Sequence, residues 1–268
     1  MTLSHLALAA LFALPATAVA QSTPQTDPSL SEQGSYRWGI GLGVVALDSP
    51  FAGEGTRTNP IPLVLFEGER LFFRGISGGA HLFQGETFGL DAIVALRVDG
   101  VDADDLGAAE LARNGIDRAR LDDRDHSLDM GLAGAWRGAA GELELTAKAD
   151  VTGTSDGYEL TARYGYAIDI GRGQLTPSIS VSHLSKDLAN YYYGTLDEEV
   201  ARGVVDYKPG SATVPTVGLT YVRSIGARWQ FLTRLQYSVL PTALSDSPLL
   251  EPDRDGVGSV LVGLAWGF

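Results

Sequence analysis

The sequence contains no cysteine among its 268 residues. This absence excludes disulfide bonds, thiolate metal ligands, a cysteine nucleophile and a lipid-modified N-terminal cysteine. Beyond residue 20 the sequence also lacks any apolar run of about 18 residues, the length that marks a candidate transmembrane helix. Any part of the chain that spans a membrane must therefore do so as β-strands.

Basic residues are scarce as well. Lysine and arginine total 20 against 33 aspartates and glutamates, which gives a formal net charge of −13 and a pI near 4.6. The sequence has no basic stripe, phosphate-cradling loop or dinucleotide fingerprint, so we expect no nucleic-acid partner and no cofactor. The acidic cluster from Asp99 to Asp105 lacks the glycine and the final glutamate of a helix-loop-helix calcium site, and we predict no metal site.

The amino end has the features of an export signal. An apolar run from Leu6 to Ala20 closes on the small residues Ala18 and Ala20, although no lysine or arginine precedes it. The run is too short to cross a bilayer as a helix. We predict that residues 1–20 are a signal peptide and that the polar segment 21–35 is a disordered periplasmic tail.

The carboxyl end alternates large apolar residues with small or polar ones up to the final residue. A period of two places alternate side chains on one face of a strand, and a tall apolar face is what a membrane barrel strand presents to lipid. The terminal phenylalanine is similar to the signal by which bacterial barrel proteins are recognised for insertion into the outer membrane. The residues of this predicted insertion signal are Val260, Val262, Leu264, Trp266 and Phe268.

The same alternation recurs along the chain in segments about as long as a tilted transmembrane strand. Apolar and aromatic residues occupy one face of each segment, and charges of both signs occupy the other. We expect the charged face to line an enclosed polar lumen, at Arg97, Glu142, Glu144, Lys148, Glu159, Arg163, Asp169 and Arg234. We expect the other face to meet lipid, with an aromatic girdle that includes Trp38, Tyr158, Tyr164, Trp229, Phe231, Trp266 and Phe268.

The connections between the segments are of two kinds. Short glycine-rich turns alternate with long polar connections at 48–58, 99–125, 187–212 and 242–255, which carry nearly all of the net negative charge. Short turns are typical of the periplasmic side and long loops of the outside, so the strand count must be even. Splitting Leu71–Gln84 at Ser77 to Gly79 predicts an antiparallel up-and-down barrel of twelve strands over residues 36–268, and ten is the alternative.

Three consecutive tyrosines, Tyr191 to Tyr193, lie in one of the long connections. We interpret them as part of the girdle at the lipid interface, where amphipathic rings are stable. A ligand-stacking patch on the loop is the alternative. The acidic connections either attract cations to the mouth of the barrel or are simply solvated.

Several motifs resemble those of the MipA/OmpV family of outer-membrane proteins, also called the MltA-interacting protein family. The resemblance extends over the chain from Tyr36 and includes the glycine-spaced WGIGLGVV that begins at Trp38. Its more specific parts are the NPIPL to LFF stretch from Asn59 to Phe73 and the SDSP stretch from Ser245 to Pro248. Phe51 stands where the family usually has tyrosine, and the connection 99–125 is longer than usual.

The resemblance implies a non-enzymatic protein of the bacterial outer membrane, in contact with outer-membrane lipid and lipopolysaccharide. It also implies a scaffold that joins a lytic murein transglycosylase to a murein synthase. A narrow cation-admitting channel is the second hypothesis. A hydrolase at the barrel rim is a distant third, because Gly75 to Gly79 matches G-x-S-x-G without a following helix and nothing shows His81, His126 or His183 converging on a nucleophile.

Overall fold

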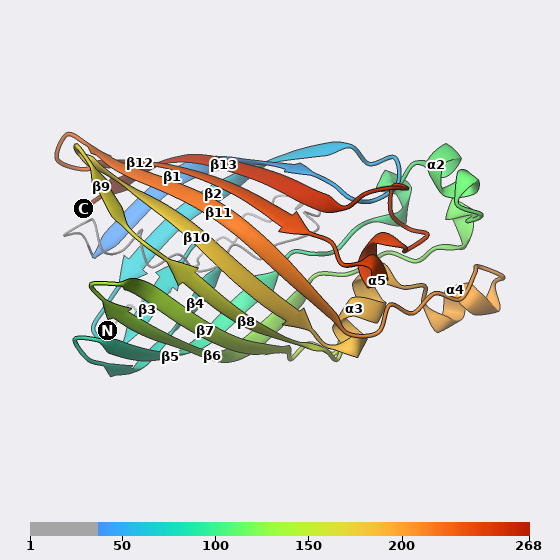
Figure 1. Cartoon of the computed structure of the whole chain (residues 1–268), viewed down its shortest axis with the longest axis horizontal. Helices are drawn as coiled ribbons and strands as arrows, with labels where there is room; N and C mark the ends of the chain where they lie inside the picture. Colours follow the sequence, from blue (N-terminus) through green and yellow to red (C-terminus); the bar gives the residue numbers. More distant parts are fainter. Residues whose placement is uncertain (1–36) are drawn as a thin grey trace, which may run out of the picture.

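The computed structural model describes residues 37–268, which form a closed antiparallel β-barrel (Figure 1). Consecutive strands are hydrogen-bonded to each other, except that β8 and β9 both pair with β10, and β13 returns to pair with β1, from Gly39 opposite Gly267 to Leu47 opposite Ser259. The strands are β1 (Trp38–Asp48), β2 (Thr56–Glu67), β3 (Leu71–Arg74), β4 (Ser77–Gln84), β5 (Phe88–Arg97), β6 (Ser127–Gly138), β7 (Gly141–Asp150), β8 (Tyr158–Gly165), β9 (Ile168–Ile170), β10 (Gly173–Leu184), β11 (Ala212–Ile225), β12 (Trp229–Val239) and β13 (Gly256–Gly267).

The barrel has twelve crossings, because β8 and β9 are two parts of one of them. Both pair with β10, and only Tyr166 and Ala167 separate them. The predicted fold class and the count of twelve are confirmed. The predicted signal peptide and tail, by contrast, lie outside the described residues.

The predicted position of one turn is wrong. The turn between β3 and β4 lies at Gly75 and Ile76, so Ser77 to Gly79, where the sequence suggested a break, are already paired within β4. Gly75 has a φ of +65°, a left-handed conformation that glycine adopts without steric cost. The β3 strand is therefore only four residues long and covers only the last part of β2.

The two faces of the barrel wall differ in character as the alternation predicts. Outward side chains such as Leu42, Leu145 and Ile179 are large, apolar and exposed. Inward positions hold charged, hydroxyl and small residues, and many of these are buried. Among residues 37–268 no helix has the length and apolar character needed to cross a membrane.

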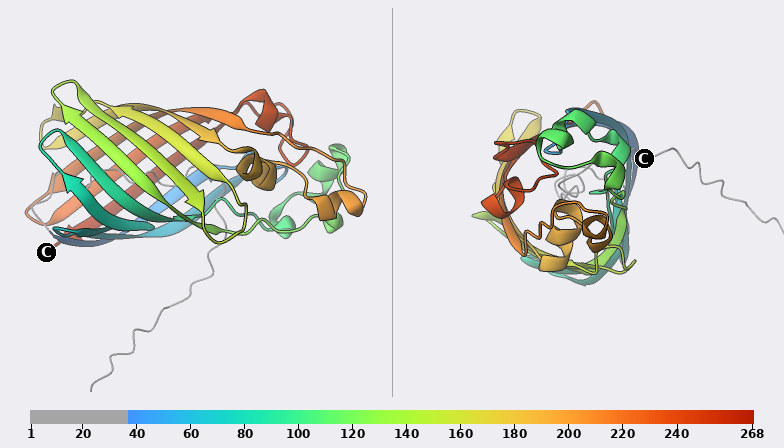
Figure 2. Two further views of the ribbon diagram at one scale, coloured as in Figure 1. Left: turned by 90° about the horizontal axis from the view of Figure 1, so that it is seen from below. Right: turned by 90° about the vertical axis from the view of Figure 1, so that its right-hand side faces the viewer.

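The long connections fold together over one end of the barrel, which we call the cap (residues 49–55, 98–126, 185–211 and 240–255; Figures 1 and 2). Phe51, Leu111, Leu188 and Leu244 come from the four different connections and belong to one buried hydrophobic cluster. The cap is thus a packed unit and not a set of solvated loops. Its helices are η1 (Ala103–Asp105), α2 (Ala108–Arg113), η2 (Arg118–Arg120), α3 (Lys186–Tyr193), α4 (Asp197–Ala201) and α5 (Thr242–Ser245).

The assignment of Tyr191 to Tyr193 to the lipid girdle is wrong. These residues form the last turn of α3, which begins where the Ser185 hydroxyl accepts a hydrogen bond from the Leu188 amide. Tyr192 and Tyr193 are buried in the cluster of the cap, and Tyr191 packs against it. Burial raises the pKa of Tyr192 and Tyr193, so both phenols stay neutral.

Candidate functional site

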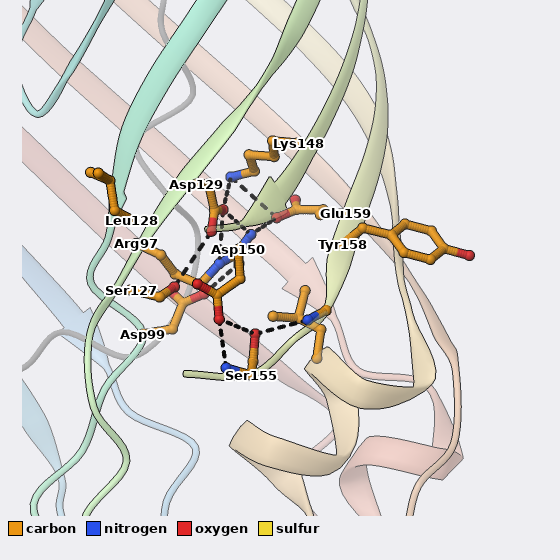
Figure 3. A network of polar contacts seen from close by, with 12 residues as sticks. Arg97, Asp99, Ser127, Leu128, Asp129, Lys148, Asp150, Ser155, Tyr158 and Glu159 are labelled. Carbon is orange, nitrogen blue, oxygen red and sulfur yellow. Dashed lines mark hydrogen bonds and ion pairs between the residues drawn. The ribbon is translucent and has the colours of Figure 1, made fainter. Parts of the chain in front are cut away.

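The barrel interior just below the cap contains a buried network of five charged side chains (Figure 3). Arg97 at the end of β5 donates to Asp129 of β6 through Nε (3.0 Å) and Nη2 (2.6 Å), and to Glu159 of β8 (2.8 Å). It also donates to Asp99 at 2.9 Å. Lys148 of β7 lies 3.2 Å from Glu159 and 3.8 Å from Asp129. We call these residues the Arg97 network.

The Arg97 network connects four neighbouring strands, β5 to β8, on the inner face of the barrel wall. The side chains of Arg97 and Asp129 are only 3% and 1% exposed, so their charges are removed from water. Such burial costs several kcal/mol for each ion unless close partners and hydrogen bonds compensate it. The arginine is compensated by three carboxylates, and two of these carboxylates also face Lys148. The network therefore fixes β5 to β8 relative to one another.

A second polar cluster lies on the inner face of β2 to β5, nearer the end with short turns. Arg74 makes a bidentate pair with Glu67, through Nε (3.0 Å) and Nη2 (2.8 Å). His81 lies between two carboxylates, with Nε2 3.2 Å from Glu67 and Nδ1 2.8 Å from Asp91, and Gln84 donates to Asp91. This cluster attaches the short β3–β4 hairpin to both of its neighbours.

A cavity of about 100 Å³ lies between these two groups, inside the barrel. On β3, β5 and β6 the lining includes the apolar residues Phe72, Ile93 and Ala133, together with the charged residues Arg74, Asp91 and Arg137. The opposite wall is polar, and includes Lys148, Glu159 and hydroxyl side chains of β8, β10 and β11. A second cavity of about 70 Å³ lies directly beneath α3 and shares Glu159, Ser182 and Thr216 with the first.

Most of the predicted lumen charges point into the barrel. Six of them are buried on the inner face, whereas Glu142 is half-buried beside Arg137 and Asp169 is exposed, where it accepts a hydrogen bond from Gln174. Two of the buried residues, Arg97 of β5 and Glu159 of β8, contact each other at 2.8 Å. The six buried residues are Arg97, Glu144, Lys148, Glu159, Arg163 and Arg234.

The predicted lipid-face and insertion-signal residues lie on the outer surface or at its edge. Trp266 is half-buried because its ring meets Trp229 edge to face at 4.9 Å, and Phe231 is also half-buried. Their roles as girdle and insertion signal stay predictions. The exposed members are Trp38, Tyr158, Tyr164, Trp229, Val260, Val262, Leu264 and Phe268.

Three interactions in the structure are not indicated by the sequence. Asp129 lies between the outward residues Leu128 and Met130, which indicates an inward position, but its partner Arg97 comes from another strand. The His81 cluster joins residues of four strands, which no local pattern reveals. The third is a buried pair in the cap between Arg124 and Glu199, whose atoms approach to 2.8 and 2.9 Å.

The residues considered for catalysis are not brought together. Ser77 of the G-x-S-x-G string begins β4, no helix follows it, and its hydroxyl donates to the Arg74 carbonyl. His126 accepts a hydrogen bond from the Gly100 amide, and His183 contacts the hydroxyl of Thr213. In the described part of the chain, no three or more His, Asp or Glu side chains are grouped to hold a metal ion.

The sequence matches the family described as MltA-interacting protein MipA over residues 40–268. The chain belongs to the MipA family. It is 31% identical to the outer membrane protein YiaT of Escherichia coli (strain K12) over 97% of this chain and 98% of the relative. It is 27% identical to the MltA-interacting protein of the same strain, over 88% and 91% of the two chains. OmpV of Vibrio cholerae is 27% identical over about half of each chain.

Solved structures similar to this MipA-family chain are outer-membrane barrels at low sequence identity. The NanC porin has 6% identity and a TM-score of 0.47, with 85% of this chain and 100% of that chain covered. The COG4313 outer membrane channel from Pseudomonas putida F1 has 9% identity and a TM-score of 0.41, with 92% and 100% covered. The relatives' names and the barrel fold confirm the outer membrane as the compartment. The cap then lies outside the cell and the short turns face the periplasm.

The outer surface of this MipA-family barrel yields a prediction on stability. Leu145 points outward from the middle of β7, and replacing it by arginine is expected to lower the free energy of unfolding by about 2–4 kcal/mol, because the charge enters hydrocarbon. Urea unfolding in phospholipid vesicles measures the change. V151R, beyond the end of the same strand, is the matched control and should cost only about 0–1 kcal/mol. Equal losses in both variants would contradict the assigned membrane position.

Proposed function

We propose that this protein is a non-enzymatic scaffold of the outer membrane that holds murein-processing enzymes at its periplasmic side. The observation that carries the proposal is the Arg97 network under the packed cap. Four strands are tied together by buried ion pairs at the level where a through-pathway would have to run. A barrel fixed in this way is suited to anchoring and not to transport.

The class of partner follows from the relatives. A relative that aligns with most of this chain is named MltA-interacting protein. On that basis the partners are a lytic murein transglycosylase and, together with it, a murein synthase. The available surface consists of residues 21–35 and the five periplasmic turns, which carry Glu69, Arg70, Glu86, Arg172 and Arg228. Such a small surface suits a weak or transient contact.

Binding of the full-length barrel to a purified lytic murein transglycosylase tests the proposal. The barrel is captured in detergent micelles, and the enzyme that it retains is measured for the native chain, a chain without residues 21–35, and the double variant R172A/R228A. K186A removes an equivalent exposed charge on the cap and is the matched control. We expect weaker binding in at least one of the two periplasmic variants and unchanged binding in K186A. Failure of the native chain to bind, or equal binding by all four proteins, would reject the scaffold.

A narrow cation-admitting channel is the second candidate, because the two interior cavities share lining residues along the barrel. Planar-bilayer recording of the purified barrel separates the two functions. The scaffold predicts no steady current, since the cap is packed over one end of the barrel and the Arg97 network lies in the lumen beneath it. A steady cation-selective current that decreases when Asp99 is replaced by asparagine would favour the channel instead.

A further inference from the structure

The barrel wall has an incomplete region beside β2. The β3 strand pairs with β2 only at Leu65 to Glu67, and the turn at Gly75 adds one more hydrogen bond, from its amide to the Val64 carbonyl. Between Thr56 and Leu63, therefore, no described strand lies against the side of β2 that faces away from β1. We call this stretch the open edge. It lies on the extracellular side of the β3–β4 turn.

Two prolines adapt the open edge to a membrane. The Glu67 amide donates to Arg37 on the β1 side, whereas the Val64 carbonyl accepts from Gly75 on the other side. Backbone groups alternate in direction along a strand, so the even-numbered positions, including Pro60 and Pro62, face the open edge. Proline has no amide hydrogen, so these positions leave no unsatisfied donor there. An unsatisfied donor in hydrocarbon costs several kcal/mol.

The prolines also prevent a partner β-strand from pairing fully with the open edge. A partner strand that adds to a sheet edge needs both donors and acceptors from that edge. The open edge offers no donor at Pro60 or Pro62. The outward side chains near it, at Leu42, Val44 and Leu96, are apolar and exposed. Thr58 keeps its amide donor and the carbonyls of Pro60 and Pro62 remain acceptors, so the part of the open edge at the two prolines is the part suited to lipid chains.

The inner face of β2 changes character along the open edge: Arg57 and Asn59 point inward at its extracellular part, and Ile61 and Leu63 point inward at its periplasmic part. Leu63 is buried on the inner side of β2, and its Cδ1 lies over Gly263, where an added Cβ would be 2.6 Å away. Phe72 and Ile93 continue this surface on β3 and β5, and Ala133 extends it on β6, where it lines the larger cavity. We call Leu63, Phe72, Ile93 and Ala133 the apolar wall, and it lies beside the periplasmic part of the open edge.

From this arrangement, we propose that the open edge is a lateral entry through which one acyl chain of an outer-leaflet lipid reaches the apolar wall of the lumen. The chain passes Leu63 and lies against Phe72 and Ile93, which line the cavity, and it stops before the charges of Lys148 and Glu159. Burial of each methylene group contributes roughly 0.8 kcal/mol, so a few of them suffice to hold the chain. The inference does not depend on binding to murein enzymes.

Photolabelling from the bilayer tests the lateral entry. The full barrel is reconstituted in vesicles that contain a phosphatidylcholine with a diazirine in the middle of one acyl chain. After irradiation, mass spectrometry maps the labelled residues. We expect label on the inward residues Leu63 and Ile93 as well as on the outward Leu132, and none on the inward polar Thr146. Label confined to outward residues would overturn the proposal.

A cavity-filling variant makes the test specific. A133W places a large ring against the apolar wall and should reduce labelling of Ile93 about tenfold, while Leu132 is labelled as before. A162W adds the same ring on the outer face of β8 and is the matched control. Heat-modifiable gel mobility confirms that both variants fold. Equal labelling of Ile93 in the native chain and A133W would also overturn the proposal, because the chain would then not occupy this wall.

Discussion

Replacing Arg97 by methionine is expected to lower the free energy of unfolding by about 3–5 kcal/mol, because its buried carboxylates lose their main countercharge. Lys148 contacts Asp129 and Glu159 but cannot replace the hydrogen bonds that Arg97 donates to them. Urea unfolding in phospholipid vesicles, followed by tryptophan fluorescence, measures the effect. R172M, in an exposed periplasmic turn, is the matched control and should change stability by no more than about 0.5 kcal/mol.

The double variant R97M/D129N distinguishes the loss of countercharge from a simple loss of packing. If uncompensated charge is the cause, removing Asp129's charge as well should restore part of the stability, and the two single changes should not add. A double variant that loses the full sum of the two would show that packing dominates. A loss below about 1 kcal/mol in R97M would mean that the network is solvated.

Replacing Glu199 by glutamine is expected to open the cap without unfolding the barrel. Glu199 is fully buried, and it accepts hydrogen bonds from Arg124 and from the amides of Asp122 and Leu196. The substitution leaves the buried guanidinium of Arg124 without a carboxylate, at a cost of about 3–5 kcal/mol. Hydrogen exchange in the connection 98–126 should then accelerate by about two to three orders of magnitude, since each tenfold corresponds to about 1.4 kcal/mol.

The neighbouring residue offers a matched control for this cap variant. Glu198 is exposed on the same helix, and E198Q removes the same charge without touching the buried pair. Its exchange rates should equal those of the native chain. Amides in β7 and β10 should exchange slowly in both variants. Faster exchange in the barrel strands of E199Q would contradict the assignment of the cap as a separately opening unit.

The strands of this barrel were predictable because the alternation of apolar and polar residues within each strand shows which side faces lipid and which faces the lumen. The alternation in β7 and β12 places apolar residues outward and charges inward within one segment, and the structure follows it. The even strand number followed from the two kinds of connection. The β3–β4 turn was misplaced by two residues, because Gly75 and Gly78 offer equally suitable breaks and only pairing with β2 and β5 decides between them.

The cap and the partners within the lumen could not be predicted in the same way. Tyr192 and Tyr193 are buried because connections distant in sequence pack on α3, and the three tyrosines carry no local sign of those contacts. Arg97 was expected in the lumen, yet Asp129, its closest carboxylate, was not singled out, because one strand does not show which residue lies opposite. The pattern of a single strand shows that a side chain points inward, but it does not show which residue of another strand that side chain contacts.

The hydrogen-bonded junction of β1 with β13 has a consequence for biogenesis. Every other pairing joins strands that are neighbours in sequence and needs only a hairpin, whereas this junction brings together strands more than two hundred positions apart. Bringing such distant strands together carries the largest loop-closure entropy, so hairpins should assemble first and the cylinder should seal last. A chain truncated before Gly256 would lack β13 and would form an open sheet with two unpaired edge strands. Such a sheet could not close into a barrel, and its unpaired edges would be unstable in lipid.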